Sequence, residues 1–69
     1  MNKDKLILLL NEKVSEFNRL YDQAQLVKRN LLQSMKFPEY GIVSHPVMIN
    51  RLLLKRRNEI NSLQQLLIQ

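Results

Sequence analysis

Apolar side chains recur every three or four residues along the first half of the chain. A spacing of three, four or seven residues places them on one stripe of an α-helix, as in coiled coils and other helices that pack on helices. No proline or glycine interrupts positions 3–36, and Asn2 or Asp4 can cap the first turn. The pattern predicts a helix over 3–36, on which Phe17 and Tyr21 stack four residues apart. The stripe consists of Leu6, Leu10, Phe17, Leu20, Ala24, Val27 and Leu31.

The same spacing returns near the carboxyl terminus and predicts a second helix over 47–68. Arg56 takes the seam position between Leu53 and Ile60, so its guanidinium must find a partner or reach water. Either Ser44 or His45 can cap this helix, and the serine is chemically the better choice. The apolar positions are Ile49, Leu53, Ile60, Leu63 and Leu67.

Between the helices, residues 37–46 contain both prolines, the glycine and the histidine of the chain. Pro38 disfavours helical dihedrals at the residue before it, and Pro46 suits the first turn of a new helix. Gly41 is expected to take a positive φ in a tight turn that begins near Pro38. The sequence therefore predicts an all-α fold, a two-helix antiparallel hairpin that occupies residues 1–69 as a single domain.

Unequal helix lengths suggest that the hairpin needs a partner. At 1.5 Å per residue the first helix would span roughly 50 Å and the second roughly 33 Å, so residues 3–13 would project beyond the second helix. Five consecutive apolar residues lie in that overhang, and a thin two-helix core cannot cover them. We therefore expect a bundle completed by a second copy, with a dimer favoured, or by another protein. The expected interface is Leu6, Ile7, Leu8, Leu9, Leu10, Leu63, Leu66 and Leu67.

Two other arrangements would change this picture. Ile42 and Val43 in the turn could fold back on the core, or the first helix could break near Asn11 and double over. Either arrangement would alter which apolar side chains remain uncovered.

The net charge of +5 is concentrated near the turn. Acidic and basic side chains balance over residues 1–27, and residues 60–69 carry no charge. A cationic surface near the turn would bind nucleic acid or an acidic protein, or would keep an apolar small protein soluble. The candidate contacts are Lys28, Arg29, Lys36, Arg51, Lys55, Arg56 and Arg57.

Several function classes lack their usual residues. The chain has no cysteine, so disulfides and thiolate metal sites are excluded, and a cytoplasmic location is expected. Glu12 and Lys13 end the apolar run too early for a membrane span. Ser44 and His45 are adjacent, which points their side chains apart and does not make a nucleophile–base pair. We expect no enzyme activity, no cofactor, no metal and no small-molecule substrate.

The sequence thus predicts a non-enzymatic helical interaction protein, such as a small adaptor, regulator, inhibitor or chaperone-like subunit. The alternative is a nucleic-acid-binding regulatory protein that uses the basic residues near the turn.

Overall fold

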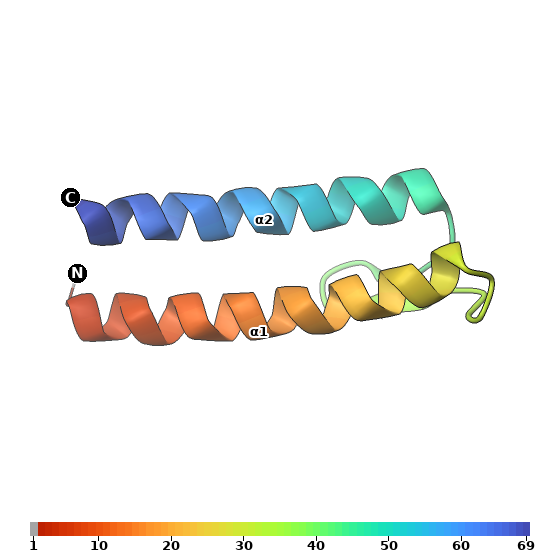
Figure 1. The fold of residues 1–69 in the computed structure, drawn as a ribbon, viewed down its shortest axis with the longest axis horizontal. Helices are drawn as coiled ribbons and strands as arrows, with labels where there is room; N and C mark the ends of the chain where they lie inside the picture. The colour runs from red at the N-terminus through yellow and green to blue at the C-terminus, as the bar shows by residue number, and fades with distance from the viewer. Residues whose placement is uncertain (1) are drawn as a thin grey trace.

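Two antiparallel helices make up most of the computed structural model, which describes residues 2–69. Helix α1 spans Lys3–Lys28 and helix α2 spans Pro46–Ile68, and a short β-hairpin of β1 (Met35–Phe37) and β2 (Gly41–Val43) connects them. The helices lie side by side, with both chain ends at the same end of the molecule (Figure 1). The predicted two-helix hairpin is therefore confirmed, with a small antiparallel sheet added to it.

The prediction that the first helix continues to residue 36 is wrong, because α1 ends at Lys28. Asn30 follows with a φ of 61°. Its N–H donates to the Val27 carbonyl at 3.1 Å, and the Leu31 N–H donates to the Leu26 carbonyl at 2.8 Å. These two hydrogen bonds form a Schellman motif, which pairs the last carbonyls of the helix and turns the chain away.

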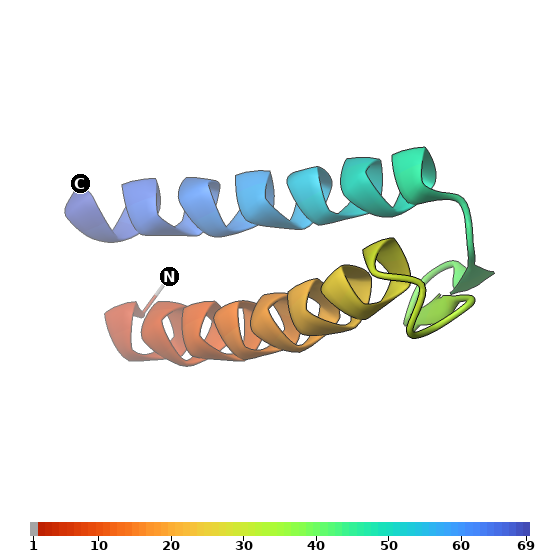
Figure 2. The same cartoon turned by 45° about the vertical axis from the view of Figure 1, so that its right-hand side comes forward.

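Residues 35–43 form the β-hairpin where the sequence predicted helix and turn. Met35 pairs with Val43 and Phe37 with Gly41, so these residues share the face of the ribbon that packs on the core. The Tyr40 N–H donates to the Phe37 carbonyl at 3.2 Å, and Gly41 follows with a φ of 77°. The positive φ predicted for Gly41 is confirmed. The hairpin turns back behind the helices and lies to one side of them (Figures 1 and 2).

Each helix begins at a capping side chain. The Asn2 side-chain oxygen accepts a hydrogen bond from the Asp4 N–H at 2.9 Å, which confirms one of the two predicted caps of α1. In α2 the cap is His45, whose Nδ1 accepts from the Val47 N–H at 3.2 Å. The preference for Ser44 was wrong, because Pro46 occupies the first helical position and the preceding residue becomes the cap.

The predicted overhang of residues 3–13 is absent. Ion pairs join Lys13 to Glu59 and Glu16 to Arg56, so each step along α1 matches one step back along α2. By this register Leu6 comes level with the last turns of α2, and its side chain is buried. The shorter α1 is the reason, since the eight residues by which the prediction overran would add about 12 Å of helix.

The main core lies in the half of the molecule near the turn, where the hairpin packs against both helices. Phe37 and Ala24 are completely buried, and the rings of Phe17 and Tyr21 stack with centroids 5.9 Å apart, as predicted. Val43 folds back to contact this core, whereas Ile42 stays exposed. The core cluster is Leu20, Ala24, Val27, Met35, Phe37, Ile49, Leu52 and Leu53.

Candidate functional site

Arg56 joins all three parts of the fold. Its guanidinium donates to the carboxylates of Glu16 on α1 and Glu39 at the tip of the hairpin, and it lies 5.6 Å from the centre of the Phe37 ring. Only 8% of its side chain is exposed. The prediction that an arginine at this seam must find a partner or reach water is met by two carboxylates. Arg56 is therefore a structural residue, because a guanidinium held by two carboxylates offers nothing to an external anion.

A second cation, Lys55, holds the hairpin tip from outside. Its Nζ donates to the Tyr40 hydroxyl at 3.0 Å and lies 5.7 Å from the centre of the Tyr40 ring. This hydrogen bond, together with the charge interaction with Tyr40, raises the pKa of Lys55 above its usual value. Lys55 is fully exposed to solvent, so the contact orients the side chain while leaving its charge accessible.

The seven basic residues expected to act together do not form one surface. Arg56 is buried, and Lys55 and Arg57 are two positions apart, about 200° around α2, so they face different sides. Lys28 and Arg29 are exposed at the end of α1, Lys36 is exposed on β1, and Arg51 is exposed on α2.

The eight residues expected to form an apolar interface also differ in burial and do not lie on one surface. Leu6 is buried in the interior of the single chain, so its side chain is not available at the surface. Leu9, Leu10, Leu63 and Leu67 are half-buried. Ile7, Leu8 and Leu66 are exposed.

One row of apolar residues on α1 stays partly uncovered along most of the helix. We call Ile7, Leu10, Val14, Phe17 and Tyr21 the α1 stripe. Ile7 and Tyr21 at its ends are 46% and 47% exposed, and the three residues between them are half-buried. The spacing of three and four residues keeps all five on one side of the helix.

The hairpin covers the opposite side of α1. Lys36 and Pro38 border a hollow with Arg19, Leu20 and Gln23. Tyr21 is two positions from both Arg19 and Gln23, which places it about 200° around the helix from each. The α1 stripe therefore faces away from the hairpin.

A second apolar surface lies where the hairpin meets the start of α2. Three of its aliphatic side chains are exposed: Ile42 by 76%, Val47 by 57% and Met48 by 42%. We call this cavity of about 550 Å³ the loop-end hollow. Its lining residues are Ile42, Val43, Ser44, His45, Val47, Met48 and Arg51.

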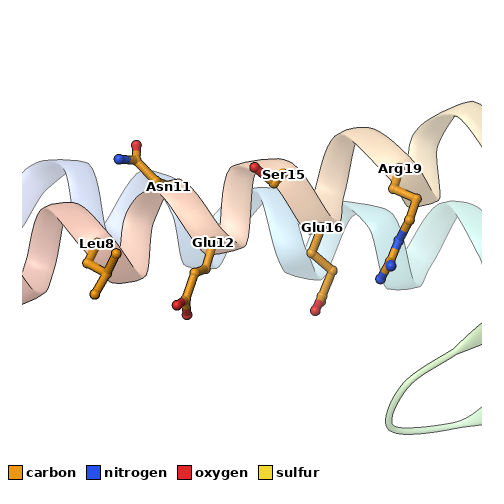
Figure 3. Close-up of a pocket in the computed structure, with 6 residues that line it drawn as sticks. All are labelled: Leu8, Asn11, Glu12, Ser15, Glu16 and Arg19. Carbon is orange, nitrogen blue, oxygen red and sulfur yellow. The ribbon is translucent and has the colours of Figure 1, made fainter.

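A depression on the outer face of α1 is a weaker candidate for a binding site than the loop-end hollow. Its lining comes from that single helix, and Leu8, Glu12, Glu16 and Arg19 extend along one edge of it (Figure 3). Glu16 is already paired with Arg56. Because no second element forms a wall, the depression does not enclose a ligand.

Two specific features are absent from the described residues 2–69, namely a membrane-spanning helix and a cluster of metal ligands. Neither helix within residues 2–69 combines the length and the apolar character that crossing a bilayer requires. Over the same residues, acidic and histidine side chains do not gather in groups of three that could hold a metal ion. No protein-family model, no curated protein and no solved structure matches the chain.

Two parts of these surfaces were missed by the sequence analysis. The partial exposure of Val14 and Tyr21 does not follow from the apolar spacing, because periodicity does not say how wide a covered face is. The loop-end hollow depends on the β-hairpin, which the helical pattern concealed. The signal that could have indicated it is the run Val47, Met48 and Ile49, because three consecutive apolar residues of a helix cannot all face the same partner.

Proposed function

We propose that this protein is a non-enzymatic interaction protein that assembles with a second copy through the α1 stripe. The observation that carries the proposal is the open side of α1. Near the turn the hairpin covers one side of the helix pair, and the apolar row of the α1 stripe stays partly uncovered on the other side. An amphipathic helix that covers this row would remove it from water, which is the usual way for helical hairpins to complete a bundle.

The order of residues in the α1 stripe favours a second copy as the occupant. A two-fold axis makes an interface self-complementary, so a helix that pairs with itself in antiparallel orientation needs a stripe with matching halves. The α1 stripe is centred on Val14. Ile7 and Tyr21 are each seven positions from Val14, so Ile7 would meet Tyr21 of the second copy. Leu10 is four positions before Val14 and Phe17 three positions after it, so these two would meet with an offset of one residue. Every apolar side chain then contacts another apolar side chain.

The flanking residues fit the same arrangement. Asn11 lies three positions before Val14 and Asn18 lies four positions after it, on the same side of the stripe, so the two amides would come close to each other across the two-fold axis. Both side chains are exposed in the single chain. Neither brings a charge into the interface, so pairing does not require burial of an unpaired ion.

The mass of the protein at high micromolar concentration tests this proposal. We expect a dimer, and we expect Ile7→Asp to weaken it at least about tenfold, because two symmetry-related carboxylates would enter the interface. Leu8→Asp is the matched control. Leu8 is 62% exposed, is adjacent to Ile7 and lies about 100° away around the helix, outside the α1 stripe.

The control also separates packing from charge. Leu8→Asp places a new carboxylate four residues from both Asp4 and Glu12, whereas Ile7→Asp has no acidic residue at that spacing. Loss of the dimer at Ile7 alone therefore reflects the interface. A folded monomer at high micromolar concentration, or equal loss in both variants, contradicts the proposal.

Nucleic-acid binding through the basic residues is the alternative. It has less support, because Arg56 is buried and Arg57 faces a different side of α2 from Arg51 and Lys55, which share one face. Contacts with a phosphate backbone weaken steeply with salt. If the alternative holds, duplex or single-stranded DNA binds at low salt, and Arg51→Glu flattens the salt dependence. A protein that shifts neither form at low salt excludes it.

A further inference from the structure

The loop-end hollow has apolar walls on two elements of the fold. Ile42 projects from the outer face of the hairpin, because its neighbours Gly41 and Val43 share the ribbon face that packs on the core. Val47 and Met48 project from the first turn of α2. These three side chains remain accessible, although the buried core begins at the next residue, Ile49.

The charges around the hollow are all of one sign. Arg51 lines it directly, and Lys36 is the cross-strand partner of Ile42, so both side chains point from the same face of the ribbon. Among the residues that the structure describes, none of those lining the hollow is acidic. The first acidic residue of α2 is Glu59, about two turns beyond Arg51.

We propose that the loop-end hollow binds a short acidic segment of a partner protein that carries a large apolar side chain. The apolar side chain enters between Ile42 and Met48, and a neighbouring carboxylate pairs with Arg51. The cationic rim attracts such a segment and repels a basic one. A guanidinium and a carboxylate also form the bidentate pair that gives direction to such contacts.

The concave shape favours a protein segment over the two other anionic partners. A lipid surface lies flat and contacts the rim, so it leaves the apolar walls unfilled. A nucleic-acid backbone offers phosphates to Arg51 and Lys36, but it has no aliphatic group for Ile42 and Met48. A peptide segment supplies both groups, an apolar side chain for the hollow and a neighbouring carboxylate for Arg51.

This site is independent of the proposed dimer. Arg51 is two positions from both Ile49 and Leu53, which pack in the core, so it lies about 200° around α2 from each. The loop-end hollow therefore opens on the side of α2 that faces away from α1. Self-association through the α1 stripe leaves it accessible, and loss of the dimer leaves its lining intact.

Selection from a library of displayed random short peptides tests the site with the full chain. We expect enrichment of peptides that combine Asp or Glu with a large aliphatic or aromatic residue. Arg51→Glu and Met48→Ser should each weaken binding of the enriched peptides about tenfold or more, and added salt should weaken it in the wild type. Both positions are exposed, so both variants should retain the helical circular dichroism of the wild type.

Two matched controls come from the same helix. Arg57→Glu reverses an exposed charge outside the hollow, and Ile68→Ser removes an aliphatic side chain that is 77% exposed at the far end of α2. Neither should change peptide binding by more than about twofold.

Four results would overturn the inference. They are the absence of any enriched peptide, enrichment of basic peptides, binding that the control variants weaken as much as the hollow variants do, and binding of purely acidic peptides that matches that of the enriched ones. Vesicles with anionic lipid provide a further arm. If they bind in an Arg51-dependent manner while no peptide is enriched, the site recognises lipid and the inference is wrong.

Discussion

Arg56 occupies a seam position where α1 and α2 would ordinarily place an apolar side chain. Burial of a guanidinium costs several kcal/mol, and this cost is offset only when carboxylates surround the group. Glu16 and Glu39 provide that compensation from two different elements. Since their side chains are 31% and 56% exposed, they can return to water when the arginine is absent, whereas the arginine has no comparable access.

We therefore predict that Glu16→Gln and Glu39→Gln are strongly non-additive. Each single variant leaves Arg56 one carboxylate and should lower the free energy of unfolding by about 1 kcal/mol, so additive effects would give about 2 kcal/mol. The double variant leaves a buried cation without compensation and should lose about 3–5 kcal/mol. Urea unfolding of the four proteins measures the coupling. Additive losses would mean that the two carboxylates stabilise the fold independently of Arg56.

Gly41 provides a second prediction at a single residue. Its φ of 77° is strained for a residue with a β-carbon. Apart from Gly41 and its two chain neighbours, no atom of the described residues lies within 4 Å of the position that a Cβ would take. Gly41→Val should therefore cost about 1–2 kcal/mol of unfolding free energy through the backbone alone. Gly41→Asn should cost less, because asparagine tolerates a positive φ. Equal losses in urea unfolding would argue against a backbone origin.

At the scale of elements, the end of α1 depends on local backbone geometry. The helical pattern continues to Leu31, and lysine, glutamine and leucine in this region all favour helix. The helix nevertheless stops at Lys28, because Asn30 adopts the left-handed conformation and closes the Schellman motif. This early stop frees the chain that forms the hairpin.

Replacement of Asn30 should show how much the end of α1 at Lys28 contributes to the free energy of unfolding. Asn30→Gly removes the remaining steric cost of a positive φ and should raise the free energy of unfolding by up to about 1 kcal/mol. Asn30→Ile should lower it by about 1–2 kcal/mol, since a β-branched residue resists this conformation. Thermal or urea unfolding distinguishes these signs. If Asn30→Ile stabilises the protein, then α1 can continue past Lys28 without cost.

At the scale of the whole molecule, the β-hairpin closes one side of the helix pair. Two strands of three residues have little stability alone, and they hold together here because Met35 and Phe37 are buried against the helices. The same arrangement leaves the α1 stripe open and builds one wall of the loop-end hollow. In the proposed antiparallel dimer the two hollows would lie towards opposite ends, so one assembly would present two peptide sites.

Phe37 should therefore matter to the entire fold. Its side chain is completely buried in the core shared by α1, α2 and the hairpin, so Phe37→Ala should cost about 3–5 kcal/mol and unfold a chain of this size at moderate temperature. Tyr40→Ala is the matched control on the same hairpin. Tyr40 is 52% exposed and loses mainly its contact with Lys55, so its effect should be small. Helical circular dichroism against temperature measures both. Similar effects would mean that the hairpin is held mainly at its tip.

The sequence by itself determined the features that depend on neighbours along the chain. Apolar spacing specified two helices and their antiparallel hairpin, Asn2 was available to cap the first, and Phe17 and Tyr21 had to share a face. Arg56 at a seam position required compensation, and Gly41 was suited to a positive φ. Each of these inferences uses interactions within a few residues, whose geometry is nearly the same in any fold.

Tertiary structure decided what depends on distant parts of the chain. The β-hairpin is stable only against both helices, so the pattern of residues 29–36 could not distinguish it from more helix. The length of α1 then set the register, which buried Leu6 and left Ile7 exposed. The carboxylates that hold Arg56 lie 17 and 40 positions away. Contacts at such separations arise from the packing of whole elements, and local periodicity carries no record of them.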